Sequence, residues 1–227
     1  MTPAFFSLIE GSLFQELRVG AISNNLANIN TTAFKRDMIS FDEVLSEVRS
    51  ATDFSPGPGR HTGNELDVTL DGAGFFKIQT AEGIRYSRNG SFRLDSDGNL
   101  VNQQGDKVLG QNGTIPIQDG HVTIDKDGNV LVDNETVDKI LVVDFQKQGL
   151  LKKEGHSYYK YEGEDVDITS PEEVGMRQGY VEQSNVNPTE AMIQMMEAYR
   201  AYESVQKAIQ TMDEITNQLI ADAGMMA

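Results

Sequence analysis

The sequence predicts an α+β fold in which paired N- and C-terminal helices form a coiled-coil-like layer and an antiparallel all-β domain is inserted between them. Two observations support this prediction. The C-terminal stretch carries an apolar seam at heptad spacing, and the middle of the chain consists of short β-prone runs separated by turn sequences. We expect a discontinuous helical domain over residues 1–49 and 181–227, a linker over residues 50–64 and an all-β domain over residues 65–180.

The N-terminal segment is expected to form an amphipathic helix from residue 4 to about residue 27. Its apolar positions recur at helical spacing and form a candidate surface for the C-terminal seam; they are Phe6, Ile9, Leu13, Leu17 and Gly20. Asn and Thr are frequent over residues 24–35, and they favour caps and turns because their side chains compete for backbone hydrogen bonds. A helix end and an ordered turn are therefore predicted there. Apolar residues between Phe34 and Leu45 suggest a second, short amphipathic piece.

The central domain is predicted to be antiparallel because turn signals recur roughly every 8 to 12 residues, which leaves no room for helical crossovers. The expected strands cover residues 66–70, 75–78, 85–87, 91–94, 122–124, 130–132, 139–145 and 158–161. The stretch before them contains Pro56-Gly57-Pro58-Gly59, and this turn chemistry predicts a linker.

The start of the C-terminal helix is predicted by three residues. Asn187 fits the N-cap, Pro188 the first helical position and Glu190 the third. The seam follows at alternating steps of three and four, with Met195, Ala198, Tyr202, Val205, Ile209, Met212, Thr216 and Leu219. Such a seam implies a partner helix. A helix in a monomeric core would show a similar stripe, and we favour pairing of the termini or of subunits.

Composition excludes several classes of function. The net charge is −16 and there is no basic run, which argues against binding to nucleic acid. The absence of cysteine excludes disulfides, thiolate catalysis and cysteine-based metal sites. The longest aliphatic run, Ile140–Val143, is too short to cross a bilayer, so we expect no membrane insertion. Glu10 interrupts the apolar start of the chain, and we therefore expect no cleaved signal peptide.

A small internal repeat is the only candidate metal site. Asp-x-Asp-Gly-Asn occurs at residues 95–99 and again at residues 125–129. An EF-hand loop needs Gly at its sixth position, whereas Gly is fourth in both copies, so a tight turn is the favoured interpretation. The three histidines, His61, His121 and His156, lie on separate segments and form no pair or triad. We therefore predict no catalytic site, no metal and no cofactor.

The Asn-rich segment closely resembles the signature of the flagellar basal-body rod and hook family. The residues that carry this resemblance are Asn24, Asn25, Leu26, Ala27, Asn28 and Phe34. A second signature, similar to the C-terminal one of the family, includes Ser184, Asn185, Val186, Asn187, Pro188 and Arg200–Glu203. Residues 66–76 and 86–100 resemble the central β domain. Ala33 departs from the pattern, since many members have Gly there.

This resemblance implies a structural subunit of the axial rod of the flagellar basal body, which crosses the periplasm, transmits torque and supports motility. It also implies export without cleavage through the flagellar type III apparatus, and contacts with copies of the chain and with neighbouring rod subunits. The length and the β module resemble the proximal-rod types, FlgF and FlgG, and the short segment after Phe41 resembles FlgF more. The alternatives are a distal-rod or hook-type subunit, a scaffold that binds rod subunits, and a secreted calcium-dependent β protein.

Assembly would then follow from the terminal helices. Helices of neighbouring copies pack into an inner tube, with the β module outside, and head-to-tail interfaces that do not close generate a helical filament. Without neighbours, the terminal helices lack partners. We therefore expect them to be largely disordered in the free monomer and to order on assembly.

Overall fold

The computed structural model describes residues 3–42, 47–118, 120–171 and 175–225. The chain divides into two compact units, each made of discontinuous segments. One, the helical unit, consists of Met1–Ala27, Asp37–Thr52 and Asn187–Ala227. The other, the β unit, consists of Asn28–Arg36 and Asp53–Val186. Both terminal segments thus belong to the same unit, and the fold is α+β with antiparallel strand pairing.

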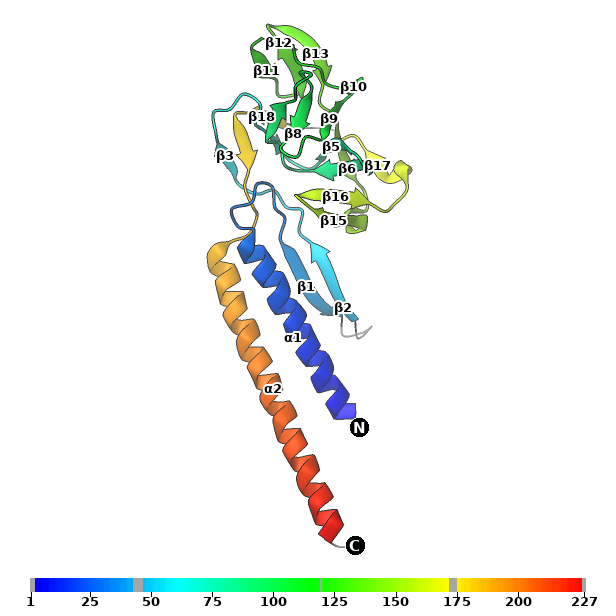
Figure 1. Ribbon diagram of the computed structural model, residues 1–227, viewed down its shortest axis with the longest axis vertical. Coiled ribbons are helices and arrows are strands. Elements are labelled where there is room, and N and C mark those ends of the chain that lie inside the picture. The colour runs from blue at the N-terminus through cyan, green and yellow to red at the C-terminus, as the bar shows by residue number, and fades with distance from the viewer. Residues whose placement is uncertain (1–2, 43–46, 119, 172–174, 226–227) are drawn as a thin grey trace. The chain divides into compact units, whose positions relative to one another are not determined.

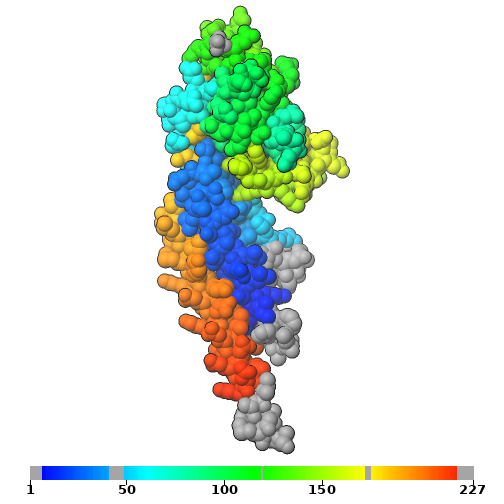
Figure 2. Space-filling model, viewed as in Figure 1, coloured from blue at the N-terminus to red at the C-terminus, as the bar shows by residue number. Residues whose placement is uncertain are grey.

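The helical unit contains two long helices, α1 (Pro3–Ala27) and α2 (Pro188–Met225), which pack side by side (Figures 1 and 2). Both predicted helices are confirmed. Strands β1 (Asp37–Asp42) and β2 (Glu47–Thr52) form an antiparallel pair that contacts α1 (Figure 1). None of the helices in the described part of the chain is long and apolar enough to span a membrane.

The β1–β2 pair differs from the short amphipathic piece that the sequence suggested. Ile39 and Phe41 alternate with Ser40 and Asp42, and this two-residue period is that of a strand. The apolar count alone did not separate this period from a helical one. Val44 and Leu45, which belonged to the same prediction, lie outside the described residues.

The largest sheet of the β unit follows the order β15-β16-β6-β5-β9-β8-β7. Its strands are β15 (Leu151–Gly155), β16 (Tyr158–Tyr161), β6 (Gly83–Ser87), β5 (Phe75–Thr80), β9 (Lys107–Gly110), β8 (Leu100–Asn102) and β7 (Phe92–Leu94). Three strands join it from the side: β10 (Gly113–Thr114) pairs with β9, and β14 (Val142–Phe145) pairs with β5 and with β17 (Ile168–Thr169).

Smaller sheets complete the β unit. One has three strands, β11 (Val122–Ile124), β12 (Asn129–Val132) and β13 (Glu135–Lys139). Two have two strands, β4 (Val68–Asp71) with β18 (Gly175–Gln178), and β3 (Gly59–His61) with β19 (Tyr180–Glu182). Short 3-10 turns are η1 (Gln148–Leu150) and η2 (Asp165–Asp167). Each predicted strand overlaps an observed one, and β3 lies within the segment expected to be a linker.

The β unit has two apolar clusters in its core. Adjacent residues of β5 supply both, because successive side chains on a strand point to opposite faces. Phe76 is buried in the first cluster with Ile78 and Leu100, and Phe75 is buried in the second. The second cluster is aromatic, with edge-to-face contacts from Phe75 to Phe145 and Tyr159.

The two Asp-x-Asp-Gly-Asn segments form turns, as predicted. Gly98 and Gly128 have φ of +77° and +86°, in the left-handed region that glycine enters readily. In the first copy, Asp95 Oδ1 accepts hydrogen bonds from the backbone N–H of Asp97 and Asn99, at 2.9 and 2.8 Å. The backbone and side chain of Asn99 stabilise the charged carboxylate and lower the pKa of Asp95. The side chain of the first Asp in each copy is thus used by the turn itself.

Candidate assembly interface

The α2 seam lies on the side of the helix that packs within the helical unit. Ala198 is fully buried, and five seam residues are half-buried: Met195, Tyr202, Val205, Ile209 and Met212. Gln206 Nε2 donates a hydrogen bond to Ser12 Oγ at 3.3 Å, which aligns α2 antiparallel to α1. Thr216 is exposed, and the side chain of Leu219 lies outside the described ones.

The apolar residues expected on α1 remain partly exposed in one chain. Ile9, Leu13 and Leu17 are 44%, 52% and 44% exposed, and we call them the α1 stripe. On other sides of the helix, Ile22 is buried and Ser12 contacts Gln206. Nine residues separate Leu13 from Ile22, or about two and a half turns, which puts them on opposite sides. The α1 stripe is therefore only partly covered within one chain, and its part in the interface stays a prediction. The side chain of Phe6 lies outside the described ones.

A second exposed stripe, which the sequence analysis did not predict, lies on the first turns of α2. Met192, Met196 and Tyr199 are 58%, 54% and 52% exposed, and we call them the α2 stripe. Their spacing of four and three residues, beside the seam, was the signal that could have revealed them. Large apolar side chains grouped in this way on a surface mark sites of interaction.

The start of α2 is fixed by the predicted N-cap. Asn187 Oδ1 accepts hydrogen bonds from the backbone N–H of Thr189 and Glu190, at 3.0 and 3.3 Å. Its backbone carbonyl accepts the N–H of Ala191 at 2.9 Å, which begins the helical ladder at Pro188. These bonds satisfy donors that the first turn of a helix cannot satisfy itself. The N-cap prediction is confirmed.

The Asn-rich signature ends α1 and begins the next strand. Asn25 is buried, and its side chain donates to the carbonyl of Asp37 and accepts from the N–H of Asp37, at 2.8 and 2.9 Å. Leu26 and Ala27 complete α1, and Asn24 is exposed. Asn28 O then accepts the N–H of Thr31 at 3.1 Å. The asparagines thus provide the backbone partners of a helix end and a turn.

In the β unit, the two signatures bind each other. The N–H of Asn185 donates to the carbonyl of Phe34 at 3.2 Å, and Asn185 Oδ1 accepts the N–H of Arg36 at 2.8 Å. Ser184 and Val186 are buried beside Asn185. Ala33 is buried at a φ of +56° and donates its N–H to the carbonyl of Glu182. Its backbone is therefore in a conformation that glycine adopts at less cost.

A buried charge cluster, made of Lys35, Arg88 and Glu182, lies at this junction of the signatures. Lys35 Nζ and Arg88 Nε each donate to one oxygen of the Glu182 carboxylate, at 2.5 and 3.0 Å. The N–H of Gly57 donates to Glu182 Oε1 at 2.8 Å. A Cβ on Gly57 would lie 2.0 Å from the carbonyl oxygen of Gln183, so only glycine allows this approach.

The role of the charge cluster is structural. Burial lowers the pKa of Lys35, and the negative charge of Glu182 opposes that shift. A buried carboxylate that is bonded by two cations and a backbone N–H keeps the signatures in one geometry. Sequence analysis missed the cluster, although Lys35 and Glu182 stand inside or beside the signatures. Among the described residues, no group of three or more His, Asp or Glu side chains could hold a metal.

Taken together, a helical unit built from both termini, an inserted β unit and exposed apolar stripes on the helices define a class of structural subunits that assemble through their ends. A family model described as "Flagellar basal body rod FlgEFG protein C-terminal" matches residues 177–221. A second, "Flagellar hook protein FlgE/F/G D1 domain", matches residues 69–132.

Relatives confirm the family over nearly the whole chain. The chain is 30% identical to flagellar basal-body rod protein FlgG of Bacillus subtilis over 260 residues, which covers 97% of this chain and 98% of the relative. It is 32% identical to flagellar basal-body rod protein FlgF of Caulobacter vibrioides over 225 residues, or 89% and 90% of the two chains. The chain belongs to the family of flagellar basal-body rod proteins of the FlgF and FlgG types. It is therefore a structural subunit of the rod, in a family whose members assemble with themselves and with other rod components.

Proposed function

We propose that this subunit polymerises into the axial drive shaft through the helical unit, with the α1 and α2 stripes as contacts between copies. The observation that carries the proposal is that both helices expose large apolar side chains, the α1 stripe on α1 and, on α2, the α2 stripe together with Ile193 and Ile215. The seam residues of α2 then hold the two helices of one copy together in a coiled-coil-like pair. The rod built in this way transmits torque, and the subunit has no catalytic role.

The positions of the stripes support contacts that do not close. Ser12 contacts Gln206 and the two helices are antiparallel, so Leu13 lies at the level of residue 205 on α2. That level is nine residues beyond Met196. At 1.5 Å per residue the two stripes are separated by roughly 14 Å along the helices. Most of each stripe is therefore left uncovered in one copy. A stripe of one copy meets the other stripe in a copy displaced along the axis, and repetition of such a heterologous contact builds a filament.

Export through the flagellar type III apparatus, without a cleaved signal peptide, is part of the proposal. A rod subunit that crosses the inner membrane unfolded needs terminal helices that fold only after export. The helical unit suits this route, because Ile22, Ala191 and Ala198 are the only apolar side chains buried in α1 and α2 among those described. So small a core provides little stability before neighbours arrive.

The test is a charge placed in each stripe. We expect Leu13→Asp and Met196→Asp to abolish rods in purified basal bodies and swimming in soft agar, because each aspartate would have to be buried without a partner. Ser23→Asp on α1 and Gln210→Asp on α2 add the same charge at exposed polar positions and are the matched controls. Wild-type rods and motility in the two stripe variants would contradict the proposal.

A further inference from the structure

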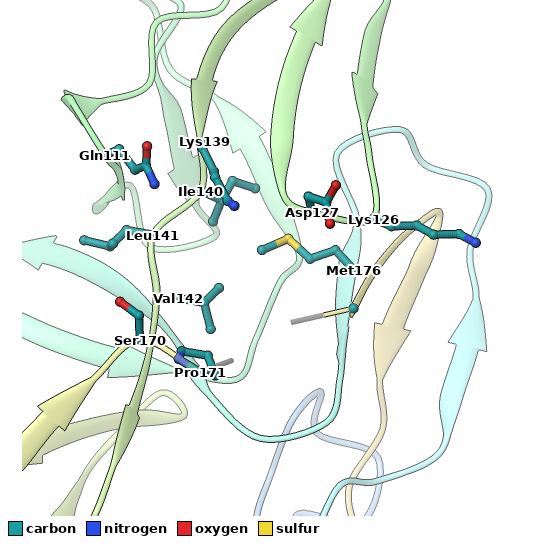
Figure 3. A pocket seen from close by; sticks show the side chains of 11 residues that line it. Gln111, Lys126, Asp127, Lys139, Ile140, Leu141, Val142, Ser170, Pro171 and Met176 are labelled. Carbon is teal, nitrogen blue, oxygen red and sulfur yellow. The ribbon is translucent and has the colours of Figure 1, made fainter. Parts of the chain in front are cut away.

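The last segment of the β unit, residues 175–186, pairs with early strands of that unit, and we call this segment the strap. Its strands β18 and β19 bind β4 and β3 in antiparallel register. In the described part of the chain, β4 and β3 have no other strand partner. The side chain of Met176, in β18, is buried in the first apolar cluster and points toward Ile140 and Val142 (Figure 3). Without the strap, both early strands lose their pairing and the cluster loses a side chain.

Backbone hydrogen bonds also join the strap to the first segment of the β unit, residues 28–36. The carbonyl of Glu182 accepts the N–H of Ala33 at 2.8 Å, and the N–H of Gln183 donates to the carbonyl of Pro58 at 2.9 Å. Segments from opposite ends of the β unit are thus held against each other. Such a contact forms only when both segments are present, because each supplies backbone partners that the other needs.

Glu182 of the strap is the negative member of the charge cluster. It is the only carboxylate among the described residues that bonds Lys35 or Arg88, whose side chains are 0% and 2% exposed. If the strap detaches, the two cations lose their counter-charge in an interior that does not solvate them. Removal of one member of a buried ion pair is strongly destabilising relative to the small net stability of a folded domain. Electrostatics therefore opposes folding of the β unit without the strap, in addition to the lost strand pairing.

We propose that the strap is a closing device: the β unit keeps its fold only while residues 175–186 are docked, and it opens as a whole when they are not. This inference rests on the export route proposed above and adds a reason why the chain stays open along it. Residues 28–36 and the strap lie at opposite ends of the β unit. Whichever end of the chain leads through a channel, a partly emerged chain lacks one of these two segments. Its β unit therefore does not close before the passage is nearly complete.

Hydrogen exchange with mass spectrometry on the full-length monomer, at urea concentrations below the unfolding transition, tests the closing device. We expect peptides from β18 and β19 to open with the same urea dependence as peptides from β5, β8 and β9, because the strap does not open without the core strands. A smaller opening that exposes the strap while β5, β8 and β9 stay protected would overturn the proposal.

A substitution in the strap gives a second readout. Glu182→Gln should raise exchange rates throughout the β unit by about a hundredfold or more, since it leaves Lys35 and Arg88 without a carboxylate. Glu162→Gln is the matched control: Glu162 is 42% exposed and pairs with Lys152 at 2.6 Å, so its loss should change exchange by less than about threefold. Faster exchange confined to β3, β4, β18 and β19 contradicts the closing device.

The outcomes separate this inference from the proposed function. Both measurements use the free monomer, so a strap that opens alone overturns the closing device and leaves the rod function intact. Absence of the tagged chain from purified basal bodies overturns the rod function and the export role of the strap. In that case the exchange data still decide whether the β unit opens as a whole.

Discussion

At the scale of single residues, Ala33 combines a left-handed backbone with complete burial. A left-handed φ costs a non-glycine residue about 1–2 kcal/mol. Glycine would remove that cost, but it adds flexibility to the unfolded chain and loses a buried methyl group. These effects nearly cancel. The alanine is therefore tolerated, whereas a β-branched side chain would be strained at this backbone angle.

We expect Ala33→Val to lower the free energy of unfolding by about 2 kcal/mol or more, because a β-branched side chain is excluded at this φ and the site is fully buried. Ala33→Gly should change it by less than about 1 kcal/mol. Urea unfolding followed by circular dichroism measures both. Ala51→Val, at an exposed strand position, is the control and should be close to neutral. Equal stability of the two valine variants would show that the backbone at Ala33 is not constrained.

Residues also show what a sequence can and cannot predict. The Asn187 cap and the turn at Asp95 were predictable, because each depends on partners within four residues. The charge cluster was not, because Glu182 meets Arg88 across 94 residues and Lys35 across 147. No local sequence pattern predicts a hydrogen bond between residues so far apart in the chain. Lys35 and Glu182 both stand inside or beside the family signatures, but the signatures do not predict that the two side chains contact each other.

At the scale of elements, periodicity identified α1 and α2 but not which side of α1 is buried. Both sides of α1 carry apolar residues, and the pattern is the same whether a side meets its own chain or a neighbour. The exposed α1 stripe and the hidden seam were therefore grouped as one interface. The β1–β2 pair was missed for a related reason, since a few apolar residues fit a short helix or a strand equally well.

The helices lead to a prediction about the free subunit. Because they bury only three apolar side chains among those described, we expect α1 and α2 to exchange their amide hydrogens rapidly in the monodisperse monomer. The strands of the β unit, with two apolar clusters, should exchange slowly and are the internal control. Hydrogen exchange with mass spectrometry on the full chain measures both regions. Full protection of residues 190–219 in the monomer would contradict ordering on assembly.

At the scale of the whole molecule, the two units divide stability and assembly between them. The β unit contains nearly all of the buried apolar residues, so its fold is complete in one copy. The helical unit exposes the stripes, which neighbours cover in the assembly proposed above. The net charge of −16 opposes association of monomers, and apolar contacts at several sites are needed to overcome it. This division explains why the chain fits a filament better than a closed oligomer.

The position of the subunit along the rod is the remaining prediction. The alignment to FlgG runs over 260 residues although this chain has 227, so FlgG carries segments that this chain lacks, and the short segment after Phe41 also favours the FlgF type. We therefore expect a short zone of the rod near the inner membrane. A gold label on Ala81→Cys, in the exposed turn after β5, reports the position in electron micrographs of purified basal bodies, because the chain has no other cysteine. Label along the longer distal segment would instead assign the chain to the FlgG type, since only a distal subunit extends that far.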